Sequence, residues 1–220
     1  MGRRYAYLFP GQGSQYVGMG RELYETYPAA RDVFAQADDV LGIRLSMLCF
    51  EGPSEDLDDT VNTQPAILAT SVAALRVLEG VELDRADYVA GHSMGEFSAL
   101  VAAGALAFED GLRLVRERGA LMKEAGLRRP GGMVAILGLE RRALEDVCAE
   151  ARSETGDYAG VANDNCPGQI VLSGAESALK QAMAIARDRG AKRAIPLAVS
   201  IAAHSPLMED AARDFADRLA

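Results

Sequence analysis

The chain has few of the residues that bind metals or form disulfide frameworks. Its 220 residues contain no tryptophan, two histidines and three cysteines, Cys49, Cys148 and Cys166. The cysteines are odd in number, far apart and in no C-x-x-C pair, which indicates neither a disulfide framework nor a zinc site. This use of cysteine is typical of a protein in the reducing cytoplasm.

Positive charge and long apolar runs are also scarce. Lysine and arginine number 23 against 32 acidic residues, a net charge of -9, which argues against nucleic acid or an anionic membrane as the main partner. No apolar run reaches the length of a membrane span, and the start of the chain has no signal-peptide core. We therefore expect a soluble intracellular protein.

One short pattern points to chemistry. An apolar run, Tyr88 to Ala90, leads into Gly91-His92-Ser93-Met94-Gly95, and a helical pattern follows. The glycines of G-x-S-x-G leave room for a sharp strand-to-helix turn that lifts the serine hydroxyl clear of the sheet. A five-residue pattern can occur by chance, but the strand before it and the helix after it favour Ser93 as a nucleophile.

The two histidines leave a narrow choice of general base. His92 adjoins Ser93 in sequence, so its side chain should leave the turn in another direction and pack or orient it. His204 lies in a loop between an apolar strand and an amphipathic helix, where an imidazole could reach a neighbouring strand end. Serine before histidine is the chain order of α/β-hydrolases. An ordinary surface histidine is the alternative interpretation, and the Ser93 pattern favours catalysis.

The first half of the chain predicts a parallel sheet. A strand over 4–9 is followed by a glycine-rich loop over 10–15 that opens a helix, by helices over 29–41 and 64–78, and by the strand before Ser93. Loops at the carboxyl ends of parallel strands line the ligand crevice, so we expect Gln12 beside Ser93. Phosphate binding is the alternative role for this loop. The loop lacks the G-K-S/T ending of a P-loop and the third glycine of a dinucleotide-binding loop, so the sequence supports phosphate binding only weakly.

The second half predicts a separate small subdomain. After a linker over 126–132, its elements read strand 133–137, helix 140–151, strand 158–163, strand 169–173, helix 175–189 and strand 192–198. This β-α-β-β-α-β order is ferredoxin-like. We therefore expect an α/β fold with a hydrolase-like large subdomain (1–127 and 199–220), carrying a parallel sheet and a nucleophile elbow, and an inserted ferredoxin-like small subdomain (128–198). The active site would lie in the cleft between them.

One arginine lies where a helix should be apolar. With about 100° per residue, the helix over 108–123 has an apolar arc that includes Leu112, Val115 and Met122, and Arg118 falls inside it. A guanidinium stays protonated, so its burial without an anion costs several kcal/mol. Two interpretations stay open at this point: an internal salt bridge, such as one to Glu96, or a substrate carboxylate held bidentately.

Several segments occur together in a characteristic order. They are Phe9–Gln15, Thr63–Ala66, Gly91–Glu96, Arg116–Gly119, Asn165–Gln169 and His204–Met208. Taken together, they resemble the malonyl-CoA:acyl carrier protein transacylases and related acyltransferase domains over nearly the whole chain. The resemblance implies the same two-subdomain fold. Family members continue past the helix over 206–219 with further strands, one of which supplies the backbone carbonyl that orients the histidine. The present sequence stops before those strands.

The resemblance also implies roles for individual residues. Ser93 would take the acyl group from coenzyme A, His204 would act as base, and the oxyanion hole would combine the Met94 N–H with Gln12. Arg118 would hold the malonyl carboxylate. The residues at or near family positions that line the cleft are Gln64, Met122, Asn163, Asn165 and Gln169. The phosphopantetheine thiol of an acyl carrier protein would then attack the acyl-enzyme, with no metal or bound cofactor.

Several functions stay open. Malonyl transfer in fatty acid biosynthesis is the first; the others are an acyltransferase domain of a polyketide-type synthase, a serine (thio)ester hydrolase and an inactive carrier-protein-binding fragment. Arg118 discriminates against a plain hydrolase, which needs no cation in an apolar arc. The small pair Ala202–Ala203, where related domains often carry bulkier residues, leaves the choice between malonyl and methylmalonyl groups open.

The carrier partner requires a local positive patch. Acyl carrier proteins of this pathway are typically acidic and this chain is acidic too, so we expect Lys192 and Arg193, with Arg187 and Arg189 before them, to bind the carrier. The alternative is an ordinary solvated helix end, where the two arginines face the negative end of the helix dipole. We expect the protein to be a monomer.

Overall fold

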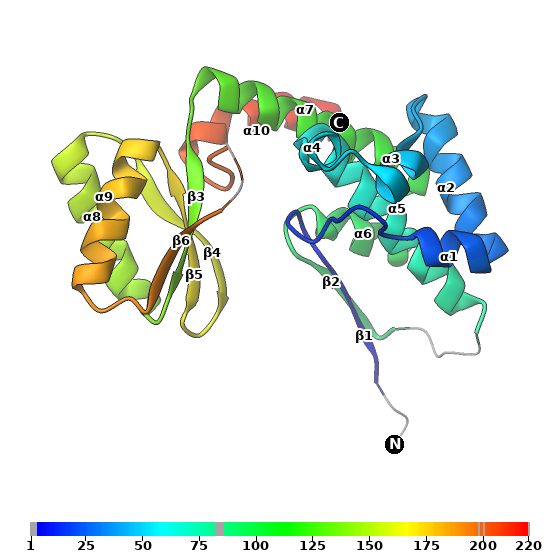
Figure 1. Cartoon of the computed structure of the whole chain (residues 1–220), viewed down its shortest axis with the longest axis horizontal. Helices are drawn as coiled ribbons and strands as arrows, with labels where there is room; N and C mark the ends of the chain where they lie inside the picture. The colour runs from blue at the N-terminus through cyan, green and yellow to red at the C-terminus, as the bar shows by residue number, and fades with distance from the viewer. Residues whose placement is uncertain (1–3, 82–85, 198, 200, 220) are drawn as a thin grey trace. The chain divides into compact units, whose positions relative to one another are not determined.

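The computed structural model describes residues 4–81, 86–197, 199 and 201–219. The chain divides into two compact units, residues 1–120 and 121–220, and the boundary falls within helix α7 (Phe108–Arg128) (Figure 1). Each unit is described by itself. No helix in the described residues combines the length and apolar character that crossing a membrane requires.

Helices dominate the first unit, and the longest lies at their centre. They are α1 (Arg21–Thr26), α2 (Pro28–Leu41), α3 (Leu45–Glu51), α4 (Ser54–Asp58), α5 (Thr60–Glu79), α6 (Gly95–Ala102) and the first part of α7. Helix α5 contacts α1, α2, α3, α4 and α6, and its residues Leu68 and Val72 are fully buried in the core. The helices predicted over 29–41 and 64–78 are confirmed. Helix α5 begins earlier, at Thr60, because the Asp59 side chain caps it by accepting a hydrogen bond from the Val61 N–H.

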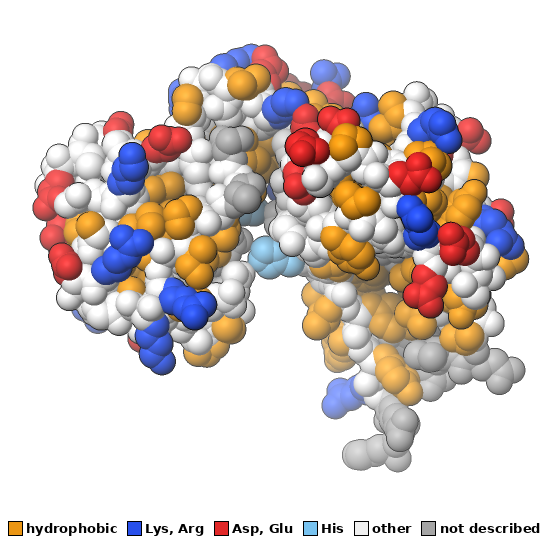
Figure 2. Space-filling model, in the orientation of Figure 1, with side chains coloured by type: hydrophobic (Ala, Val, Ile, Leu, Met, Phe, Trp, Pro, Cys, Tyr) orange, Lys and Arg blue, Asp and Glu red, His pale blue; other side chains and the backbone are white. Residues whose placement is uncertain are grey.

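Two parallel strands complete the first unit. Strand β1 (Ala6–Phe9) pairs with β2 (Tyr88–Gly91) in a register that runs from Ala6 opposite Tyr88 to Phe9 opposite Gly91. The predicted parallel pairing is confirmed, with β1 shorter than the expected strand. Leu8 and Tyr88 are 78% and 63% exposed, and hydrophobic side chains cover this part of the unit in Figure 2. Since both strands point the same way, the loops that carry Gln12 and Ser93 leave the same edge of the sheet.

The second unit holds an antiparallel sheet. Its elements are β3 (Gly132–Leu137), α8 (Arg141–Thr155), β4 (Ala159–Cys166), β5 (Gln169–Gly174), α9 (Glu176–Asp188) and β6 (Arg193–Pro196). The strands lie in the order β4-β5-β3-β6, and α8 and α9 pack side by side on one face of the sheet (Figure 1). The predicted order of strands and helices is confirmed. Position 198, at the end of the last predicted strand, lies outside the described residues.

The end of the chain packs within the second unit. After the 3-10 turn η1 (Pro206–Met208), helix α10 (Glu209–Leu219) follows. A small apolar cluster joins this segment to the end of α7: Met122, Ala125, Ile201, Ala203, Met208 and Ala211. The sequence assigns residues 199–220 to the large subdomain, whereas this packing groups 201–219 with the second unit. Positions 1–3, 200 and 220 of the predicted large subdomain lie outside the described residues.

Candidate active site

Ser93 lies on a sharp turn between a strand and a helix. Strand β2 ends at Gly91, α6 begins at Gly95, and Ser93 has a φ of 53°, in the left-handed region that residues other than glycine rarely adopt. A Cβ on Gly91 would lie 1.9 Å from the carbonyl carbon of Gly95, and one on Gly95 would lie 2.5 Å from the Phe9 oxygen. The two glycines of the G-x-S-x-G pattern are therefore required by close backbone approach.

The glycine-rich first loop packs against this turn. The His92 N–H donates to the Phe9 carbonyl oxygen at 3.0 Å, and a Cβ on Gly11 would lie 2.5 Å from the His92 oxygen. The loop is braced internally, because the Ser14 hydroxyl donates to the Gly11 carbonyl oxygen at 2.7 Å. The first loop therefore lies against the turn that carries Ser93, while the placement of Gln12 beside Ser93 stays a prediction.

Arg118 extends from α7 to the Ser93 hydroxyl. Its Nη1 donates to Gln64 Oε1 at 2.7 Å, and its Nη2 donates to Ser93 Oγ at 3.3 Å. The neighbouring glycine makes this approach possible, since a Cβ on Gly119 would lie 2.5 Å from the Thr60 carbonyl oxygen at the start of α5. Within the Arg116–Gly119 segment, Gly119 thus lets α7 approach α5 closely. This approach brings the Arg118 guanidinium within reach of Ser93.

The two hydrogen-bond acceptors of the Arg118 guanidinium, Gln64 Oε1 and Ser93 Oγ, are neutral. Burial lowers its pKa, against the opposing influence of the Glu96 charge, but an arginine stays protonated at physiological pH. The ion pairs found between described residues do not include Arg118, so the internal salt bridge to Glu96 that the sequence allowed is not formed. A charge partly removed from water and bonded to neutral oxygens favours the other interpretation, a carboxylate supplied by a ligand.

The predicted base lies in the second unit on a braced loop. His204 is exposed and has a φ of 58°. The Ser205 hydroxyl donates to the Ala202 carbonyl oxygen at 2.6 Å and accepts from the Leu207 N–H at 3.2 Å. Met122, predicted to line the cleft, belongs to the same buried apolar cluster as Ala203, the residue before His204.

Three predicted substrate residues lie on the β4–β5 hairpin. Asn163 and Asn165 belong to β4, Gln169 begins β5, and the latter two are exposed. The pairing shifts register between Asp164 and Cys166, and the Cys166 thiol donates to Gln169 Oε1 at 3.7 Å. The structure therefore gathers these three amide side chains on one hairpin.

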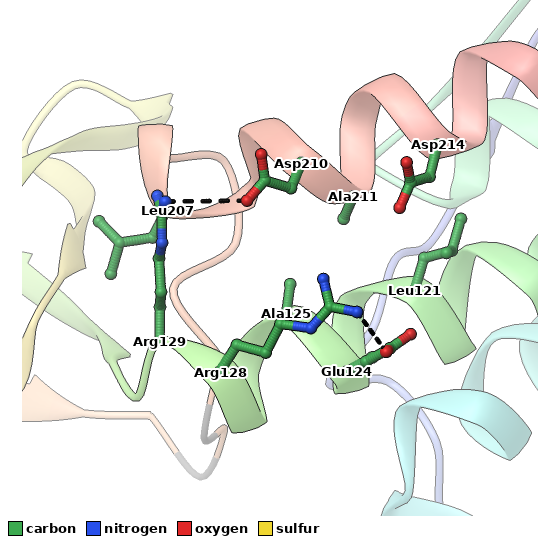
Figure 3. A pocket seen from close by; sticks show the side chains of 9 residues that line it. All are labelled: Leu121, Glu124, Ala125, Arg128, Arg129, Leu207, Asp210, Ala211 and Asp214. Atoms are coloured by element: carbon green, nitrogen blue, oxygen red, sulfur yellow. Dashed lines mark hydrogen bonds and ion pairs between the residues drawn. The ribbon is translucent and has the colours of Figure 1, made fainter.

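A pocket between the end of α7 and α10 has a different character. Figure 3 shows its lining, in which Arg128 pairs with Glu124, and Arg129 lies 3.7 Å from Asp210. Its volume is about 40 Å³, enough for only a few water molecules. This volume is far smaller than that of a typical small-molecule site.

The buried cysteines do not compete with Ser93 as nucleophiles. Burial raises the pKa of Cys49 to about 12 and that of Cys148 to about 11, which keeps both thiols protonated at neutral pH. Cys166 is exposed, and all three are free. Among the described residues no group of three or more metal-ligating side chains occurs.

Thr60 is a residue near the site that sequence reasoning missed. Its hydroxyl donates to Gln12 Oε1 at 3.0 Å and accepts from Gln64 Nε2 at 3.0 Å. The available signal was the spacing of Thr60 and Gln64, which is i and i+4 at the start of a helix and brings both side chains to one face. This spacing can be recognised in the sequence only if the helix is predicted to begin at Thr60 and not at residue 64.

The chain belongs to the acyl transferase domain family, which matches residues 6–220. It is 51% identical, over 94% of its length, to the malonyl CoA-acyl carrier protein transacylase of Bacillus subtilis strain 168, and it spans 65% of that relative. The predicted family resemblance is confirmed.

Solved structures agree with this assignment. The crystal structure of an acyl carrier protein S-malonyltransferase from Vibrio cholerae O1 biovar eltor has a TM-score of 0.92 and 44% identity, covering 99% of this chain and 70% of that one. A malonyl-transacylase in complex with the type II PKS acyl-carrier protein AntF has a TM-score of 0.94 and 43% identity, with the same coverage. The α/β fold of this chain is therefore that of acyltransferase structures.

Proposed function

We propose that this chain transfers a malonyl group from malonyl-CoA to the phosphopantetheine thiol of an acyl carrier protein, in fatty acid biosynthesis. The observation that carries the proposal is the Arg118 guanidinium 3.3 Å from the Ser93 hydroxyl, bonded to neutral oxygens. Malonyl has a carboxylate at the end opposite its thioester, so a cation beside the nucleophile would select this acyl group over uncharged ones. The names of the relatives support the same reaction.

In the proposed architecture, the turn that carries Ser93 is a nucleophile elbow in a hydrolase-like large subdomain made of 1–127 and 199–220. The β-α-β-β-α-β segment over 128–198 is an inserted ferredoxin-like subdomain. The left-handed φ of Ser93 supports the first assignment, and the strand order β4-β5-β3-β6 supports the second.

The proposed reaction proceeds by two acyl transfers. His204 takes the proton of Ser93 as its oxygen attacks the thioester carbonyl, and the oxyanion is stabilised by the Met94 N–H, at the start of α6, and by Gln12. Collapse expels the coenzyme A thiol with the proton from His204. The phosphopantetheine thiol then gives its proton to His204, attacks the acyl-enzyme and releases Ser93, which regains the proton. No metal or bound cofactor enters these steps.

Substrate binding in this scheme centres on Arg118, which holds the malonyl carboxylate. Five further residues are assigned to the lining of the acyl and thioester sites: Gln64, Met122, Asn163, Asn165 and Gln169. Gln64 is fully buried and bonded to Arg118, which supports its assignment most directly. The small, buried Ala202 and Ala203 next to His204 make methylmalonyl-CoA the competitor to compare.

A second candidate is malonyl transfer in a polyketide pathway. It is favoured by one specific comparison, the malonyl-transacylase solved in complex with a type II PKS acyl-carrier protein, which is 43% identical to this chain. The chemistry on Ser93 would be the same, and only the carrier would differ.

The reaction can be tested by following the acyl group. The protein incubated with malonyl-CoA should gain one malonyl group by intact mass, and added phosphopantetheinylated carrier should take that group from it. Methylmalonyl-CoA and acetyl-CoA serve as comparison donors. Free malonate without acylated carrier would instead indicate a hydrolase. Carrier binding without any acylation would indicate a non-catalytic carrier-binding fragment, and both results would contradict the proposal.

The proposed carrier surface contains fewer cations than the basic cluster that the sequence predicts. Arg189 pairs with Glu150, and Arg187 donates to the Ala194 carbonyl oxygen at 3.3 Å. Lys192 and Arg193 are exposed at the start of β6, and the Lys192 stem packs over Gly138. These two cations are therefore the ones available to an acidic carrier, whose approach the net charge of -9 would otherwise oppose.

Reversing both charges should separate the two half-reactions. Lys192→Glu with Arg193→Glu is expected to slow malonyl transfer to the carrier at low salt and to leave acylation by malonyl-CoA unchanged, because only the carrier approaches this surface. Arg142→Glu with Lys180→Glu makes the same change in net charge on exposed helical positions of the second unit and is the control. Rising salt should slow the unmodified protein selectively in the carrier step. Equal carrier rates for both double variants would exclude the surface.

The proposed setting is a cytoplasmic monomer. Three free cysteines support a reducing compartment, and the molecular mass in solution tests the monomer.

A further inference from the structure

Strand β6 presents alternate side chains to the two faces of its sheet. Helices α8 and α9 cover one face of the sheet (Figure 1), and Ala194 packs against the apolar core beneath them. Side chains alternate along a strand, so Arg193 and Ile195 point to the opposite face. We call the face opposite to the two helices the distal face.

The strand register places one proposed substrate amide on this distal face as well. In β5, Ile170 and Leu172 belong to the core under the helices, so Gln169 points the other way. Arg193 lies opposite Leu137 of β3, and Leu137 lies opposite Gln169. Two strand spacings, about 10 Å, therefore separate the cation from the amide. A carrier held at Arg193 would lie on the side of the sheet that carries Gln169, which is assigned to the acyl and thioester sites.

Two apolar side chains follow the cation along this edge of the sheet. Ile195 is 41% exposed and Leu197 is 37% exposed. The Leu197 N–H donates to the Met133 carbonyl oxygen at 2.9 Å, so the pairing with β3 continues as far as Leu197. Side chains two residues apart on a strand are about 7 Å from each other on one face. The edge strand therefore presents a cation and then two partly exposed apolar groups in a row.

This combination is typical of a protein-binding surface. Surface cations mainly accelerate the encounter with an acidic partner, and salt screens their effect. The lifetime of a complex depends more on apolar side chains that the partner covers, usually at the centre of a polar rim. An acidic carrier drawn to Lys192 and Arg193 would meet Ile195 directly beside them.

We infer that Ile195 is the apolar contact that retains the acyl carrier protein, with Lys192 and Arg193 as the charged part of the same surface. The inference rests on the proposed function and deepens it, because it names the face of the sheet and the side chain that the carrier covers. Charge complementarity between the two cations and an acidic carrier supports this choice of partner.

Ile195→Ala removes three carbons from this surface and leaves both cations in place. We expect the Kd for a fluorescently labelled, phosphopantetheinylated acyl carrier protein to rise roughly 5- to 20-fold, measured by anisotropy, because the covered apolar area is lost. Ile195→Leu keeps the volume and should bind within about twofold of the unmodified protein. The loss in Ile195→Ala should persist at high salt, whereas the loss in Lys192→Glu with Arg193→Glu should shrink there.

Two comparisons separate a contact with the carrier protein from other effects. Leu127→Ala truncates another exposed apolar residue of the second unit and should leave the Kd for the carrier unchanged. Acylation of Ile195→Ala by malonyl-CoA, and transfer of its malonyl group to free pantetheine, should proceed at the unmodified rates. Neither small thiol compound has the protein surface that Ile195 would contact.

The binding and acyl-transfer measurements distinguish this inference from the proposed function. Carrier binding that depends on Ile195, in a protein that never accepts a malonyl group, would contradict the proposed function and leave the inference in place. The inference is overturned if the unmodified protein binds no carrier, if Ile195→Ala binds it equally well, or if Leu127→Ala loses as much. Equal losses with malonyl-CoA or pantetheine would assign Ile195 to the pantetheine arm and would also overturn it.

Discussion

Ser93→Ala should abolish formation of the acyl-enzyme. The Ser93 hydroxyl is the proposed nucleophile, and the left-handed φ of Ser93 places this residue on the sharp turn at the end of β2. Loss of a catalytic nucleophile typically removes nearly all turnover, by several orders of magnitude. The measurement is the intact mass after incubation with malonyl-CoA, with the exposed Ser54→Ala as a matched control that should still gain the malonyl group.

A malonyl adduct that persists in the Ser93→Ala protein would exclude Ser93 as the acyl acceptor. The Cys49 and Cys148 thiols are not expected to accept the malonyl group, because both are buried and burial raises their pKa values. Prior alkylation of the exposed Cys166 removes the remaining thiol from consideration.

Arg118→Ala is expected to shift acyl selection from malonyl towards acetyl groups. A charge pair that loses one partner in a buried site costs about 3 to 5 kcal/mol, which corresponds to roughly a 100-fold fall or more in the ratio of kcat/KM for malonyl-CoA over acetyl-CoA. The ratio isolates the acyl group, because the two donors share the same thioester and the same coenzyme A. Arg113→Ala on the same helix, whose exposed guanidinium pairs with Asp110, is the control and should leave the ratio unchanged.

An unchanged ratio in Arg118→Ala would assign the arginine a structural role and would remove the main support for an anionic acyl group. If kcat/KM falls for both donors and their ratio stays constant, Arg118 likewise does not select between the two acyl groups.

The second unit could be predicted from sequence element by element because its apolar pattern is regular. Helix α8 buries Leu144, Val147, Cys148 and Ala151 at helical spacing, and the strands around it are bounded by glycine. The short helices α3 and α4 were not predicted, since helices of seven and five residues are too short to establish a periodicity. The observed helix α5 starts before the predicted one because its first residues, such as Thr60 and Thr63, are polar although buried.

The site was predictable where local backbone geometry determines it. The glycines around Ser93 are required by contacts within a few residues of sequence or with the adjoining strand, so the pattern reveals the turn. The partners of Arg118 were not predictable, because they depend on the approach of α7 to α5 at Gly119. The pairing of Arg189 with Glu150, which joins α9 to α8 and reduces the predicted basic cluster, likewise depends on tertiary packing.

Ser93 and His204 are the two residues other than glycine that have positive φ within the described ranges. A left-handed conformation costs a residue with a Cβ about 1 to 2 kcal/mol, and glycine is nearly exempt from this cost. Selection of variants for thermal stability alone would therefore favour glycine at these two positions. The same substitutions would remove the hydroxyl and the imidazole assigned to catalysis, so a stability screen of this protein must also select for acylation.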